Sequence, residues 1–207
     1  MILDASKISL IALFAVSMVG SPGPVNMVLM ASGASFGYQR SLPFLLGSIS
    51  GFLLVCLATA LGLGTLFTTF PLLQVVFLFL SVLYILYLAW RVATASPKIM
   101  DASDQPGYLA GIILHPLNPK AWVTIIAAYS QFISPNASYA GQIATIMLIF
   151  ALVSFPLNSI WCYGGNLLRQ LVTSGRALRI INVSLAILMV VTVGLALMQA
   201  DVLESYL

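Results

Sequence analysis

The sequence predicts an all-α integral membrane protein in which six transmembrane helices form two inverted three-helix repeats. Its 207 residues include 8 Lys+Arg and 5 Asp+Glu, so only 6% are charged, and 61% are hydrophobic. About 25% of the residues in a typical soluble domain are charged, and a soluble chain of this size cannot bury so much apolar surface. The composition therefore excludes a soluble enzyme, a nucleic-acid-binding module and a disordered chain.

Six apolar segments are long enough to cross a bilayer core of about 30 Å, which requires about 20 helical residues. They span residues 8–31, 42–66, 71–90, 108–133, 141–163 and 178–199. We interpret the first as a membrane span and not as a signal peptide, because Asp4 weakens its basic start and the polar residues Ser21–Pro24 lead into more apolar sequence. The whole chain, residues 1–207, is thus expected to form one transmembrane domain.

The second segment carries a stripe of small residues. Gly47, Gly51, Ala58 and Gly62 follow one another at spacings that let helix backbones approach closely. We favour internal packing as the use of this stripe, and a homodimer interface is the alternative.

The third segment differs from the second because its side chains are bulky. Phe77–Leu80 favour a lipid-facing position, and Tyr84, Tyr87 and Trp90 follow at the end of the segment. Amphipathic rings of this kind prefer the membrane–water interface, so this end is expected at the membrane surface.

Lysine and arginine gather on one side of the predicted membrane. The loops after the first, third and fifth segments hold six of the eight, namely Arg40, Arg91, Lys98, Arg169, Arg176 and Arg179. The opposite side has only Lys7, and the C-terminal tail carries Asp201 and Glu204. The positive-inside rule therefore places the odd-numbered loops in the cytoplasm and both termini outside it.

The first and fourth segments are both interrupted by prolines. Residues 21–26 read SPGPVN, and residues 115–120, about 95 positions later, read HPLNPK. The matching breaks divide the chain into repeat one at about 1–92, a cytoplasmic linker at about 93–106 and repeat two at about 107–207. Because each repeat has three helices, the second must enter the membrane from the opposite side. Inverted repeats with broken helices at matching positions are typical of the binding site of a secondary transporter.

The prolines explain why such breaks require a polar environment. Proline removes a backbone donor and clashes with the preceding turn, and unpaired backbone groups are costly in hydrocarbon. Half-helix ends also bring partial charges of both signs to the membrane midplane, which suits a zwitterionic amino acid. A simple proline kink is the alternative for either break alone. The candidate substrate-binding residues are Pro22, Gly23, Pro24, Asn26, His115, Asn118, Pro119, Lys120 and Asn158.

Lys120 is the charged residue predicted to lie deepest in the membrane. Counted from Tyr108, it lies about 18 Å from the start of the segment, and a charge at that depth indicates function. The alternative is a helix that starts at Ala121 and leaves Lys120 at the interface. Residues 121–133 are too few to span a bilayer, so we expect Lys120 to face a cavity.

The remaining polar residues of the spans leave several roles open. His115 is the only intramembrane group that can titrate near neutral pH, and a hydrogen bond that merely stabilises the break is an equal alternative. Asn158 follows Pro156 and either lines a cavity or is an ordinary polar residue. No Asp or Glu lies in any span, which argues against a carboxylate proton relay and against a divalent-cation site. We expect no metal and no cofactor.

Taken together, the motifs resemble the LysE/RhtB family of amino-acid exporters. The resemblance rests on Pro22-Gly23-Pro24 with Asn26 and on Asn118-Pro119-Lys120, and it covers nearly the whole chain. It implies export of amino acids from the bacterial cytoplasm across the inner membrane, driven by the proton gradient. The branch of cysteine and O-acetylserine exporters is most similar, and the homoserine, threonine and leucine branches stay open. Ser21 departs from the family, in which many members have Asn or Thr before the PGP motif.

The predicted function is a secondary transporter that exports small neutral amino acids or derivatives of the cysteine, O-acetylserine and threonine/homoserine type. Its partners are this substrate and the lipid bilayer, with no nucleic acid. The hypothesis is that the substrate carboxylate binds Lys120 and a half-helix N-terminus. The ammonium then binds carbonyls freed at Pro22–Pro24 and the amide oxygen of Asn26 or Asn118.

Three other functions remain as alternatives to amino-acid export. The first two are a carrier for an ion or another small solute of the same superfamily, and a membrane subunit that does not transport. The third, a membrane-embedded enzyme, is disfavoured because no intramembrane acid can orient His115.

Overall fold

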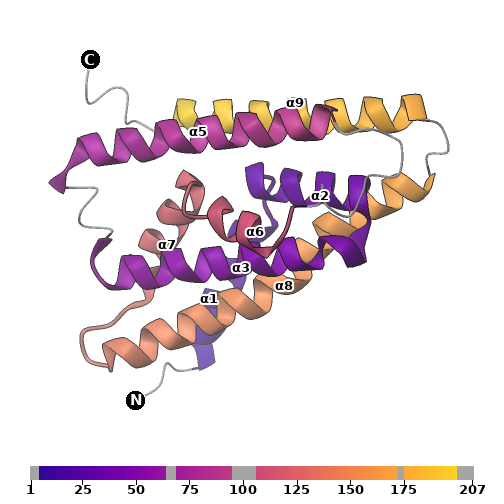
Figure 1. Cartoon of the computed structure of the whole chain (residues 1–207). Helices are drawn as coiled ribbons and strands as arrows, with labels where there is room; N and C mark the ends of the chain where they lie inside the picture. The colour runs from indigo at the N-terminus through magenta and orange to yellow at the C-terminus, as the bar shows by residue number, and fades with distance from the viewer. Residues whose placement is uncertain (1–4, 64–68, 95–105, 172–174, 200–207) are drawn as a thin grey trace.

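The fold is all-helical in the part of the chain that the structure describes. The computed structural model describes residues 5–63, 69–94, 106–171 and 175–199. These ranges contain α1 (Ala5–Gly20), α2 (Pro24–Phe36), α3 (Tyr38–Ala60), α5 (Pro71–Thr94), α6 (Tyr108–Leu114), α7 (Pro119–Phe132), α8 (Tyr139–Leu171) and α9 (Gly175–Gln199) (Figure 1). No strand occurs in the described ranges, and the predicted all-α class is confirmed.

Several helices are long and apolar enough to cross a membrane. Three described helical stretches can each cross a membrane alone, namely α3, α8 and Gly175–Thr192 of α9. One further span can be formed by α1 and α2 together, with a bend of 62° between them. The helices follow the predicted segments in order, with the fourth segment divided between α6 and α7. The largest boundary difference is at α8, which continues to Leu171 instead of ending at 163. It continues through two glycines because Gly165 packs against the backbone of α2.

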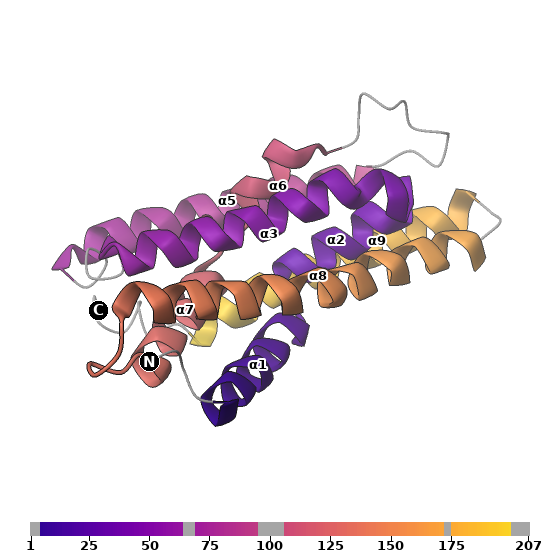
Figure 2. The same ribbon diagram turned by 90° about the horizontal axis from the view of Figure 1, so that it is seen from below.

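The helices pack as pairs, and the partners in a pair come from different parts of the chain. α2 packs against α8, α3 against α6, and α5 against α9. α5 and α9 lie side by side along one face of the bundle (Figure 1). α1 diverges from the direction of α2 (Figure 2), as their 62° bend requires.

Two clusters of buried apolar side chains flank the breaks. One joins α1, α3, α7 and α8 and includes Phe52, Ile125 and Phe150. The other joins α2, α3, α5, α6, α8 and α9 and includes Val25 and Phe44. The two breaks therefore lie where one apolar cluster gives way to the other.

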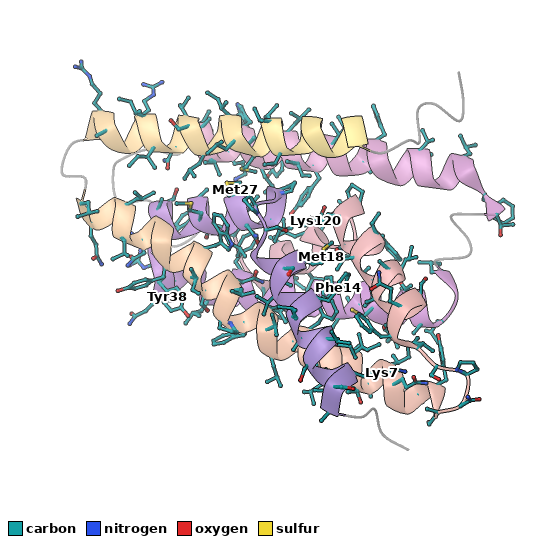
Figure 3. All side chains as sticks on the ribbon, turned by 180° about the vertical axis from the view of Figure 1, so that it is seen from behind. Lys7, Phe14, Met18, Met27, Tyr38 and Lys120 are labelled. Atoms are coloured by element: carbon teal, nitrogen blue, oxygen red, sulfur yellow. The ribbon has the colours of Figure 1, made fainter. Side chains whose placement is uncertain are left out.

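The described arginines share one end of the bundle. Arg40 lies at the start of α3, Arg91 and Arg169 near the ends of α5 and α8, and Arg176 and Arg179 at the start of α9 (Figure 1). Lys7 lies near the opposite end, in the first turn of α1 (Figure 3). Lys98, Asp201 and Glu204, which the topology prediction also used, lie outside the described residues.

The aromatic end of the third predicted segment is largely exposed. Tyr84 stacks on Tyr87 with ring centroids 6.3 Å apart, and Tyr87 lies 6.4 Å from Trp90. Phe79 and Leu80 are exposed too, as a lipid-facing position requires. The side chains of Phe77 and Leu78 lie outside what the structure describes.

The small-residue stripe serves internal packing at Gly47 and Gly51. A Cβ at Gly47 would lie 2.0 Å from the carbonyl oxygen of Tyr108, and one at Gly51 would lie 2.2 Å from that of Ile112. These contacts join α3 to α6, so the favoured use of the stripe is confirmed at these two positions. The same face is therefore covered by α6 and is not open to a second copy of the chain.

A second close contact joins α2 to α8. A Cβ at Gly33 would lie 1.8 Å from the carbonyl oxygen of Cys162, and one at Gly165 would lie 1.8 Å from that of Met30. Real Cβ atoms do not approach backbone oxygens this closely. The two backbones can therefore touch only because neither position carries a side chain.

We expect Gly165→Ala to destabilise the protein by about 1–3 kcal/mol, the usual cost of overpacking. The new methyl group would push α2 away from α8, because the atoms it meets are backbone. Thermal unfolding of the detergent-solubilised protein measures the effect. Gly164→Ala is the matched control, since nothing lies within 4 Å of a Cβ there. Equal melting temperatures for the two variants would contradict this packing.

Candidate binding cavity between the two broken helices

The first break is caused by the prolines that follow α1. The helix ends where the backbone N–H of Ser21 donates to the carbonyl of Ser17. Gly23 is extended, with φ −165° and ψ 169°, and α2 begins at Pro24. A proline suits the first position of a helix because its missing N–H would have no partner there. The chain therefore turns by 62° between α1 and α2.

Asn26 stabilises this break from the first turn of α2. Its amide Nδ2 donates to the carbonyl oxygens of Val19 and Ser21, both at 2.9 Å. These are carbonyls that the end of α1 leaves without helical partners. The binding of a substrate ammonium by carbonyls freed at Pro22–Pro24 stays a prediction.

The second break is closed in a similar way. α6 ends at Leu114, and the side chain of Asn118 caps α7 by accepting a hydrogen bond from the backbone N–H of Lys120 at 3.1 Å. The indole Nε1 of Trp122 donates to the carbonyl of Pro116 at 2.9 Å. Each break is therefore stabilised by an asparagine side chain, as the matched positions of Asn26 and Asn118 in the sequence suggest.

Lys120 joins the two breaks. Its Nζ donates to the hydroxyl of Ser21 at 2.8 Å and to the carbonyl of the same residue at 3.1 Å. Nζ also lies 3.1 Å from where a Cβ on Gly23 would be, so glycine leaves the space that the ammonium occupies. Lys120 lies in the interior of the bundle near Met18 (Figure 3). Its depth relative to the membrane surface stays a prediction.

A cavity of about 40 Å³ lies between the breaks. This is about three times the 10–15 Å³ that one water molecule requires. The cavity is lined by Met18, Val19, Gly23, Val25, Asn26, Phe52, His115, Asn118, Lys120, Ala121, Thr124, Ser154 and Asn158.

Most of the candidate residues from the sequence meet at this cavity. Six of them line it, namely Gly23, Asn26, His115, Asn118, Lys120 and Asn158. The three prolines do not: Pro24 and Pro119 start α2 and α7, and Pro22 is exposed. The prolines therefore shape the backbone around the cavity without forming its wall.

The electrostatics of the cavity favour an anionic group. Lys120 lines the cavity, and so does the N-terminus of α2. No side chain caps this end of α2. The first backbone hydrogen bond of α2 runs from Met27 to Gly23, so the N–H groups of Val25 and Asn26 have no helical partner. Such N–H groups and the helix dipole attract anions. No Asp or Glu occurs anywhere in the described ranges to neutralise this field.

The cavity is also lined by Phe52, Thr124 and Ser154, which the broken-helix motifs do not indicate. Their spacing carries a signal, because Thr124 follows Lys120 by four positions and Ser154 precedes Asn158 by four. Residues four apart lie on one face of a helix. Phe52 meets His115 edge to face, with ring centroids 5.1 Å apart, and has no comparable signal. The Nδ1 atom of His115 is buried and has no hydrogen-bonding partner in the described structure.

Comparison with known proteins identifies the family. The family model described as "LysE type translocator" matches residues 16–200. The chain belongs to this family. This assignment makes it a translocator and not an enzyme, and it confirms the family resemblance that the PGP and NPK motifs indicate. No solved structure matches the chain.

The curated relatives are similar over most of their length. The cysteine/O-acetylserine efflux protein of Klebsiella pneumoniae subsp. pneumoniae is 32% identical over 155 residues, which is 73% of this chain and 78% of the relative. The proteins of the same name from Salmonella typhimurium and Escherichia coli O1:K1 are 29% and 28% identical over 172 residues. Each match covers 82% of this chain and 87% of the relative.

Asn26→Leu should destabilise the protein because it leaves the carbonyl of Val19 without its donor and the carbonyl of Ser21 with Lys120 alone. A buried polar group without a partner costs about 1–3 kcal/mol, which lowers the melting temperature by about 2–4 °C per kcal/mol in a chain of this size. Asn136→Leu is the control, because Asn136 is an exposed loop residue. An Asn26→Leu protein as stable as the control would show that the break does not depend on this amide.

Proposed function

We propose that this chain exports small neutral amino acids or their derivatives, of the cysteine and O-acetylserine type, across the bacterial inner membrane. The observation that carries the proposal is the position of Lys120, held between two broken helices at an uncapped helix N-terminus. The names of the curated relatives support the same class of substrate. The cavity suits the carboxylate that all these substrates share.

In this proposal the substrate carboxylate replaces Ser21 at Lys120. In the structure the ammonium group of Lys120 donates to the hydroxyl and the carbonyl of Ser21, which are neutral acceptors. A carboxylate forms a stronger, charge-assisted hydrogen bond with the same group. It also gains the free N–H groups at the start of α2. The exchange therefore favours bound substrate while Ser21 satisfies Lys120 in its absence.

The substrate ammonium requires a hydrogen-bond acceptor beside the cavity. The carbonyls of Val19 and Ser21 already accept from Asn26, and the amide oxygen of Asn118 already accepts from Lys120. The amide oxygen of Asn26 remains, since only its nitrogen is engaged. We therefore assign the ammonium to Asn26, whose side chain lines the cavity.

Alternating access follows from a six-span inverted repeat. In this scheme α1–α2, α3 and α5 correspond to α6–α7, α8 and α9. The contacts between helices support the scheme. The contact of α3 with α6 corresponds to the contact of α8 with α1. The contact of α2 with α8 likewise corresponds to the contact of α7 with α3. Rocking one repeat against the other would open the cavity to each side in turn. Because Lys120 binds Ser21 of the other repeat, this bond must break or be exchanged during the movement.

Orientation and energy coupling complete the proposal. The end that carries Arg40, Arg91, Arg169, Arg176 and Arg179 faces the cytoplasm by the positive-inside rule, so both termini are periplasmic. The proton gradient drives export, as the family resemblance implies.

A homodimer, if it forms, uses a surface other than the Gly47–Gly51 face, which α6 covers.

Lys120→Met should reduce uptake of labelled cysteine into inside-out vesicles by about 100-fold or more, because loss of a buried charge partner costs about 3–5 kcal/mol. Uptake is measured with and without an imposed pH gradient, and wild-type uptake should require the gradient. Lys7→Met, at the far end of α1, is the control. Normal uptake by the Lys120→Met protein would contradict the binding of the substrate carboxylate by Lys120. Uptake by wild type without a pH gradient would contradict proton coupling.

A further inference from the structure

Besides His115, whose buried Nδ1 has no partner, three polar side chains that line the cavity make no hydrogen bond to the described residues. Thr124 is 3% exposed, Ser154 4% and Asn158 3%. Thr124 comes from α7 and the other two from α8, and all three border the same space as Lys120. Polar side chains in such buried positions are normally hydrogen-bonded, and the polar atoms of these three open to the cavity instead. Three in one cavity therefore point to a ligand with a polar group of its own.

The two hydroxyl groups also differ from others in the helices of this chain. Ser17, Ser50 and Thr59 each donate to the carbonyl four residues earlier, at 2.8–3.0 Å. That bond is open to any helical serine or threonine. Thr124 and Ser154 do not make it. Their hydroxyl groups are left available to the cavity that they line.

Thr124, Ser154 and Asn158 border the same cavity as Lys120. Thr124 lies one helical turn, about 5.4 Å, beyond Lys120 on α7. Ser154 and Asn158 are likewise one turn apart on one face of α8. A substrate whose carboxylate is at Lys120 can therefore extend its side chain toward this second group of polar atoms. Phe52 forms an apolar part of the wall and meets the ring of His115 edge to face.

We propose that Thr124, Ser154 and Asn158 bind the polar end of the substrate side chain and determine which amino acids are exported. The inference rests on the proposed export function. The site accepts a neutral group that forms hydrogen bonds, such as a hydroxyl, a thiol or an ester carbonyl. It rejects an aliphatic side chain, because the three groups would then stay unpaired. It also rejects a cationic side chain, because the described lining contains Lys120 and no acid.

The test compares amino acids that differ only at the side-chain end. Inside-out vesicles are given labelled serine, cysteine or 2-aminobutyrate, in which a methyl group replaces the hydroxyl or thiol. Wild type should take up serine and cysteine at least about tenfold more efficiently than 2-aminobutyrate, because a missing hydrogen-bonding group in a polar site is strongly penalised. The variant with Thr124→Val and Ser154→Ala should lose this preference through weaker uptake of serine and cysteine, while 2-aminobutyrate uptake persists.

Two further variants separate specificity from folding. Thr124→Ser keeps a hydroxyl and should keep the preference. Thr145→Val removes a hydroxyl of α8 that lies outside the cavity and bonds to the carbonyl of Gly141, and it should also keep the preference. If the double variant does not transport, thermal stabilisation of the purified protein by serine or 2-aminobutyrate gives the same comparison, since a ligand stabilises the state that binds it.

The outcomes separate this inference from the proposed function. Uptake of amino acids with the same preference in the wild type and in the double variant would overturn the role of the three residues and leave export intact. Absence of uptake and of stabilisation for every amino acid tested, in a folded wild-type protein, would overturn both. Loss of the preference in the double variant alone supports the inference.

Discussion

The hydrogen bonds of Lys120 to Ser21 are the interaction on which the rest of the structure depends. They hold an ammonium group in the interior of an apolar bundle and join the breaks of two helices that lie far apart in the sequence. A charge in such a place is costly unless polar groups surround it. The prolines and glycine at the first break end α1 and separate it from α2, which exposes polar backbone groups near Lys120. The side chains of Asn26 and Asn118 form hydrogen bonds with backbone groups that the breaks leave without helical partners.

The same arrangement links stability to transport. The apolar clusters on either side of the breaks, and the glycine contacts between α2 and α8 and between α3 and α6, fix the helices that carry the cavity wall. The cavity itself holds the buried Nδ1 of His115 without a partner, and it is also lined by polar side chains that make no hydrogen bond in the described structure. These groups remain available to a ligand.

Much of this could be predicted from the sequence, because the informative residues are local. Proline and glycine determine where α1 and the α6–α7 segment break, so the segments, the breaks and Lys120 could be located from the chain alone. The partners of Asn26 could not, since its bonds to Val19 and Ser21 depend on a 62° bend. Thr124 and Ser154 share helix faces with Lys120 and Asn158, but only the packing of α7 and α8 in the bundle shows that these faces border one cavity.

The central claim is that a substrate carboxylate takes the place of Ser21 at Lys120. An experimental structure of the protein with bound serine tests it most directly. The account predicts that the carboxylate lies within hydrogen-bonding distance of the Nζ of Lys120 and of the first N–H groups of α2, with the hydroxyl of Ser21 released. Serine bound elsewhere, or bound in this cavity while Lys120 still donates to Ser21, would contradict the account.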